Sequence, residues 1–155
     1  MPVATPPPVA HAAVAVRLER AIVREINTIR ARAGLSRVTT TRRLHRLARH
    51  HTLDMLRRDS FSHDGDGTTF SQRIKARVHY RKVGETLASM PREGTHGQRP
   101  WVSGARRVVS AWMHSPPHRA VILDPAYRRI GVSGKGGQMG AHHAFLVTAD
   151  FATWR

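Results

Sequence analysis

The sequence predicts an α+β domain in which helices cover a small antiparallel sheet. Three observations support this prediction. Apolar side chains recur at three- and four-residue spacing in the first half of the chain, and two apolar segments with alternating character lie near its end. At 155 residues, the chain is long enough for one domain with a sizeable core. The expected order is helix, helix, short helix, strand, helix, helix, strand, strand, which indicates layers around one core.

We predict a flexible arm rich in proline and alanine over residues 1–12 and a single domain over residues 13–155. The first residues, MPVATPPPVAHAAVAV, match a signal peptide poorly, because prolines interrupt them and no basic segment precedes them. No apolar run approaches the roughly 20 residues that a membrane-spanning helix needs.

Two amphipathic helices are expected first, over Val14–Ala33 and Arg42–Arg58. Gly34 is placed to end the first helix, and Thr39–Thr41 offer N-caps for the second. The apolar stripe of the second helix contains His51, so a buried histidine with a hydrogen-bond partner is expected there rather than a ligand. The residues of that stripe are Leu44, Leu47, Ala48, His51 and Met55.

A loop follows over residues 61–67, and its Asp64 and Asp66 resemble part of a calcium loop. Calcium is not expected, because the remaining ligand positions and the closing glutamate are absent. Thr68 or Thr69 then caps a short helix. A short strand is expected over His79–Val83, and a polar surface loop over Met90–Ser103.

The second half of the chain begins with a helix over Ala105–His114. Trp112 shares an apolar side of this helix with Val108 and Val109, which predicts that its indole is buried. Ser115 is expected to be the N-cap of the next helix, with prolines and His118 in its first turn. Two strands, over residues 128–133 and 143–151, then form a hairpin around a glycine-rich turn at residues 134–140.

The chain is strongly basic, with 26 Lys and Arg against 10 Asp and Glu and a formal net charge of +16. This charge predicts attraction to nucleic acid, anionic lipid or anionic polymers of the cell envelope. A solvated surface that simply reflects an arginine-rich composition is the alternative. Sequence-specific nucleic-acid binding is not expected, because no base-stacking or zinc-finger pattern is present. The lack of cysteine excludes disulfides and thiolate metal sites.

Several short motifs occur in the order typical of one family. The nearest match is Val108-Val109-x-x-Trp112-Met113-x-Ser115-Pro116-x-His118-Arg119. The other motifs are Ile26-Asn27-x-x-Arg30, Leu44-x-x-x-Ala48-x-x-His51-x-x-Asp54-Met55, Ser62-His63, Gly84-Glu85-Thr86-Leu87-Ala88, Ile130-Gly131-Val132 and Thr148-x-Asp150-Phe151. From about residue 18 to its end, the chain resembles the CAP superfamily (cysteine-rich secretory proteins, antigen 5 and pathogenesis-related 1) in its cysteine-free bacterial form, the SCP-like domain.

This resemblance implies an α-β-α sandwich with a central cleft lined by two histidines and two glutamates. Carried over to this chain, the histidines are His63 and His118 and the first glutamate is Glu85. The second glutamate is missing, because Met113, His114 and Ser115 follow Trp112. Two imidazoles and one carboxylate would form a three-ligand site for Zn²⁺ or another divalent cation, with one position open to water.

The leading interpretation is a monomeric, non-enzymatic binding module that is secreted or associated with the cell envelope. Its central cleft or basic surface would take a lipid, an anionic glycan or polymer, or a protein. One alternative is a metal-assisted hydrolase with His63, Glu85 and His118 as catalytic residues. Another is a basic protein that associates with nucleic acid through charge alone.

Overall fold

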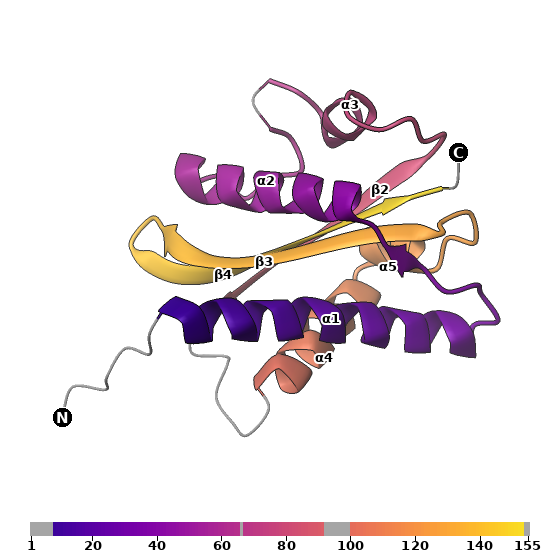
Figure 1. Ribbon diagram of the computed structural model, residues 1–155, viewed down its shortest axis with the longest axis horizontal. Coiled ribbons are helices and arrows are strands. Elements are labelled where there is room, and N and C mark those ends of the chain that lie inside the picture. The colour runs from indigo at the N-terminus through magenta and orange to yellow at the C-terminus, as the bar shows by residue number, and fades with distance from the viewer. Residues whose placement is uncertain (1–7, 66, 92–99, 154–155) are drawn as a thin grey trace.

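A four-stranded sheet lies between two layers of helices (Figure 1). The computed structural model describes residues 8–65, 67–91 and 100–153. The strand order is β1-β3-β4-β2, and only β1 runs parallel to its neighbour. These strands are β1 (Thr39–Thr40), β2 (Val83–Pro91), β3 (Arg129–Met139) and β4 (His142–Ala152). The expected α-β-α sandwich is therefore confirmed, with β1 as an additional strand where only a connector was predicted.

Five helices cover the two faces of the sheet in the described part of the chain. α2 (Arg42–Arg58) and α3 (Phe70–Lys75) lie on one face, as Figure 1 shows. α1 (Pro8–Arg32), α4 (Pro100–Met113) and α5 (Pro116–Ile122) lie on the other face. None of these helices combines the length and the apolarity needed to span a lipid bilayer.

The first helix begins earlier than its periodicity predicted. α1 starts at Pro8, so residues 8–12 of the expected arm belong to the helix, while residues 1–7 lie outside the described residues. Proline is accepted in a first helical turn, because the N–H group that it lacks would have no partner there. The predicted end is correct: Gly34 adopts φ +72°, and Leu35 N donates to Arg30 O across it.

The helices on the opposite face have the predicted caps. Thr41 Oγ1 accepts from the backbone N–H of Leu44 at the start of α2, whose predicted bounds are correct. Thr69 and Gln72 form a reciprocal capping box at the start of α3. The N-cap of α5 is Ser115 as expected, but its side chain makes no capping hydrogen bond.

Two strand predictions were wrong. β2 begins at Val83 and continues to Pro91, so Glu85 lies within a strand. The glycines expected to form the hairpin turn instead extend β3 to Met139, and only Gly140, at φ +57°, belongs to the turn. Their role is close packing: a Cβ at Gly134 would lie 2.7 Å from the Phe145 ring.

The prediction of a loop over Met90–Ser103 was wrong at both ends, because β2 continues to Pro91 and α4 begins at Pro100. Residues 92–99 lie outside the described residues.

The larger hydrophobic core lies between the sheet and the α1–α4 layer. Trp112 is 1% exposed, and its Nε1–H donates to the carbonyl of Leu87 at 2.8 Å, so its predicted burial is confirmed. Smaller apolar clusters lie under α2 and α3, around Leu44 and Ile74 and around Met55 and Leu146. The polar cluster that surrounds Glu85 lies on this second face.

Candidate functional site

The two histidines expected to share a cleft lie next to each other. His63 follows α2 in a loop, and His118 sits in the first turn of α5. Their ring centroids are 6.1 Å apart, with an angle of 54° between the ring planes. His63 is 44% exposed and His118 is half-buried, so both rings remain within reach of solvent. We call this pair the histidine cleft, after the cleft that the family resemblance implies.

Glu85 reaches the histidine cleft from strand β2, and its side chain is fully buried. Its Oε1 lies 3.0 Å from His63 Nδ1, and its Oε2 accepts from Arg73 Nη2 at 2.6 Å. Both carboxylate oxygens are therefore engaged by side chains. The structure brings Glu85 to His63 directly and places it behind the imidazole, as a group that orients the ring.

Three further side chains support Glu85, and no functional role was predicted for them. Arg73 comes from α3, and Asp150 stands opposite Glu85 in the register of β2 and β4. His51 Nε2 lies 3.8 Å from Glu85 Oε1 and 2.8 Å from Ser62 O, so the predicted core histidine with a partner is confirmed. The alternation of β4 indicates that Asp150 faces inward with Thr148. No local pattern indicates the position of Arg73.

The charge states follow from burial and from these contacts. Burial opposes ionisation of Glu85, but the hydrogen bond from His63, the neighbouring Asp150 and the charge of Arg73 lower its pKa to about 2. Burial and the neighbouring Glu85 raise the pKa of Asp150 well above its usual value, which favours its neutral form. Burial and the proximity of His63 lower the pKa of His118.

These residues fit a cation held by two histidines, with Glu85 as an outer partner. Because Glu85 is a carboxylate, the proton shared with it belongs to His63 Nδ1, which leaves the lone pair of Nε2 for a ligand. The three-ligand set of His63, His118 and Glu85 is not assembled in the structure, where the two oxygens of Glu85 accept hydrogen bonds from His63 and Arg73. Within the described residues, no three His, Cys, Asp or Glu side chains are grouped to hold a metal.

The position after Trp112 supplies no second acidic group. His114 is exposed, and its Nδ1 bonds to the carbonyl of Ser110 at 2.7 Å, one turn back on its own helix. His114 therefore does not replace the missing glutamate. The histidine cleft contains two imidazoles and one committed carboxylate.

Comparison with known proteins identifies relatives of the whole domain. The family model described as the cysteine-rich secretory protein family (CAP) matches residues 23–151. The Bacillus subtilis protein YkwD, described as uncharacterised, is 30% identical over 116 residues. That match covers 74% of this chain but 41% of the relative, so the chain spans about two fifths of the relative's length.

Solved structures show the same fold. An extracellular protein containing an SCP domain from Bacillus anthracis superposes with a TM-score of 0.73 and 21% identity, over 98% of this chain and 45% of that one. An outer surface protein from Borrelia burgdorferi gives a TM-score of 0.69 and 21% identity, over 88% of this chain and 93% of that one.

Proposed function

This chain belongs to the cysteine-rich secretory protein (CAP) family, and from that premise we propose that it is a binding module whose ligand site is the histidine cleft. The observation that carries this proposal is the state of Glu85, the one carboxylate at the cleft. It is buried, ionised and hydrogen-bonded through both oxygens to His63 and Arg73. Such a group fixes the geometry of a binding site and does not take up protons during a reaction.

Acid–base hydrolysis is poorly supported by the same residues. A general base needs a free lone pair and a pKa near the working pH. Glu85 has a pKa of about 2, and the neutral Asp150 is fully buried beneath it. A metal-dependent hydrolase is therefore the second candidate, favoured only by the two partly exposed imidazoles, since a metal bound by them alone would have positions open to water.

The proposed ligand group is a divalent cation such as Zn²⁺, bound by His63 and His118. When bound, such a cation would act as a Lewis acid that attracts an oxygen atom of a further anionic ligand. The protein's own contribution is to fix the His63 ring through Glu85 and to keep Glu85 ionised through Arg73.

We also propose that the protein acts outside the cell or at the envelope. Two of its structural relatives are described as an extracellular protein and an outer surface protein. The high positive charge of the chain suits the anionic lipids and polymers of that environment.

Calorimetric titration of Zn²⁺ into chelator-stripped protein tests the metal site. We expect one ion per chain, a loss of affinity of at least about tenfold in both His63→Ala and His118→Ala, and a loss of about 10- to 100-fold in Glu85→Gln. His143→Ala, which changes an exposed histidine on β4, is the matched control and should bind like the wild type.

Two results would contradict the proposal in different ways. Zinc binding that survives both cleft substitutions would remove the histidine cleft as the metal site. Hydrolysis by the zinc-loaded protein that disappears with a chelator and in His118→Ala would replace the binding module with the hydrolase.

A further inference from the structure

We propose that the pocket between α2 and α3 is a second binding site, which recognises a phosphate group. The pocket has a volume of about 530 Å³, within the range of small-molecule sites. Four arginines surround two apolar side chains, and no carboxylate is among its lining residues. The seven lining residues are Arg43, Arg46, Arg73, Arg77, Leu47, Val78 and His50.

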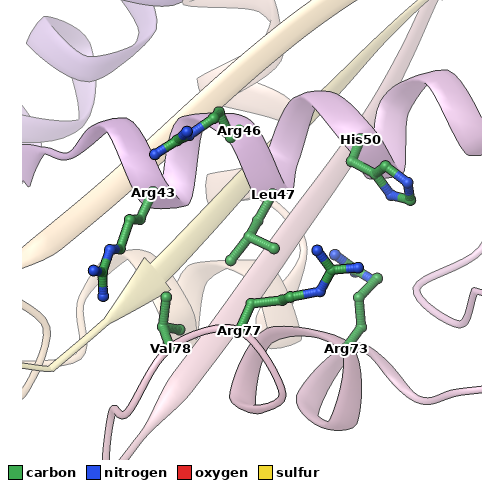
Figure 2. A pocket seen from close by; sticks show the side chains of 7 residues that line it. All are labelled: Arg43, Arg46, Leu47, His50, Arg73, Arg77 and Val78. Carbon is green, nitrogen blue, oxygen red and sulfur yellow. The ribbon is translucent and has the colours of Figure 1, made fainter.

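The arginines come from both sides of the pocket. Arg43 and Arg46 lie one turn apart on α2, while Arg73 lies on α3 and Arg77 in the turn that follows it. Figure 2 shows Arg43 extending from α2 and Arg73 and Arg77 extending toward α2 from the opposite side. A ligand in the pocket would thus meet guanidinium groups from two separate elements.

Three of these charges have no counter-charge in the described part of the chain. Arg43, Arg46 and Arg77 are exposed, and no described carboxylate forms an ion pair with them. Arg73 is different: its Nη2 donates to Glu85, while its Nε and Nη1 are buried without a hydrogen-bond partner. Like charges gathered at one pocket repel each other, and an anion bound there would relieve this repulsion.

Phosphate is the anion that suits this arrangement. The planar guanidinium group presents paired N–H donors that match the oxygens of a phosphate, and several such groups can neutralise a doubly charged phosphate ester. Leu47 and Val78 provide a small apolar surface beside the charges, on which the group attached to the phosphate can lie. No Phe, Tyr or Trp side chain lines the pocket, so the row of aromatic platforms that binds single-stranded nucleic acid is not present there; the one ring among its lining residues is the imidazole of His50.

Titration with pyrophosphate at constant ionic strength tests the site. We expect saturable binding that falls at least about tenfold in the double variant Arg43→Gln/Arg77→Gln, since each lost charge-assisted pair is a strong interaction. The control is Arg49→Gln/Arg81→Gln, which removes the same net charge from exposed arginines outside the pocket and should change the affinity less than about threefold. Circular dichroism of both variants verifies that they are folded.

A second arm distinguishes the source of the phosphate. Sedimentation with phosphatidylcholine vesicles that contain phosphatidic acid, compared with phosphatidylcholine alone, reports a lipid headgroup. Binding that is lost in the pocket variant and kept in the control variant supports the site. If the lost binding is to the vesicles, the phosphate belongs to a lipid headgroup; if it is to pyrophosphate alone, the phosphate belongs to a soluble ligand. Wild-type protein that binds neither probe, or equal losses in the two variants, overturns the proposal. Zinc binding at the histidine cleft is measured separately, because the pocket variant leaves Arg73, which also holds Glu85, unchanged.

Discussion

At the scale of single residues, the chemistry of the site is decided by the pair of carboxyl groups on β2 and β4. Glu85 and Asp150 are paired residues of the neighbouring strands β2 and β4. If both side chains were ionised, their two buried negative charges would repel each other strongly. The structure avoids this by ionising one and keeping the other neutral. Arg73 and His63 favour Glu85 as the ionised partner, because both donate to its oxygens.

Replacing Asp150 by asparagine tests this division of charge. The pKa of Asp150 is raised in the folded protein, so the folded state binds more protons than the unfolded state. Its contribution to stability is complete below the usual aspartate pKa and is lost as the pH rises toward the folded value. An asparagine amide imitates the neutral carboxyl group, so Asp150→Asn should gain stability relative to the wild type as the pH rises from about 5 to about 8, where Glu85 stays ionised.

Urea unfolding at several pH values measures this gain. Asp64→Asn, at an exposed carboxylate, should shift the free energy of unfolding by less than about 0.5 kcal/mol throughout. A large loss of stability in Asp150→Asn at neutral pH would show that Asp150 is ionised in the folded protein.

At the scale of elements, the position of α2 depends on how closely it approaches β3. A Cβ at Gly131 would lie 2.1 Å from the carbonyl carbon of Leu44 and 2.2 Å from His45 N, both in the backbone of α2. The first turn of α2 therefore rests directly on the strand. This contact fixes the helix that carries His51 and one wall of the pocket between α2 and α3.

Gly131→Ala should lower the free energy of unfolding by about 3 kcal/mol or more, because backbone atoms cannot move aside for a methyl group as a side chain can. Thermal or urea denaturation measures the loss. Gly136→Ala lies on the same strand, where a Cβ would be 3.6 Å from the Phe145 ring, and it should change stability by less than about 1 kcal/mol. Equal, small effects at the two positions would show that α2 can shift away from β3.

At the scale of the whole molecule, Arg30 connects the end of α1 to the segment between α5 and β3. Its guanidinium group is fully buried and donates to the carbonyls of Ser36, Ile122, Asp124 and Tyr127. Burial and the charge of Arg128 lower its pKa. The Arg30 side chain thus donates hydrogen bonds to carbonyl groups that are distant in the sequence. These bonds hold α5, which carries His118, against the helical layer.

Arg30→Met should cost about 3 kcal/mol or more, since it leaves buried carbonyls without donors at about 1–3 kcal/mol each. Arg30→Lys should recover only part of this loss, because an ammonium group cannot reproduce the planar fork. Arg24→Met, on the exposed side of the same helix, should change stability by less than about 0.5 kcal/mol. Denaturant unfolding of the three variants distinguishes a buried anchor from a surface arginine, and a loss of similar size in Arg24→Met would contradict the anchor.

The sequence by itself determined the bounds of α2 and the burial of His51 and Trp112, which follow from apolar periodicity and capping residues. The α-β-α sandwich and the proximity of His63 and His118 were implied by the family resemblance that the motifs of the chain carry. The glycines of β3 were wrongly predicted to form a turn, because glycine is suited both to turns and to close packing. In the structure, the adjacent side chains of Phe145 and Leu56 show that these glycines serve close packing.

Only the tertiary structure decided the role of Glu85. The family resemblance implied a metal ligand. In the structure Glu85 is a buried partner of His63 and of Arg73, which comes from a different element, and it stands opposite Asp150 of β4. The pocket between α2 and α3 could likewise not be predicted from the sequence, because its lining residues are brought together only by the packing of these two elements. The ionisation and reach of a side chain depend on charges and burial supplied by distant segments, and spacing along the chain carries no record of those distances.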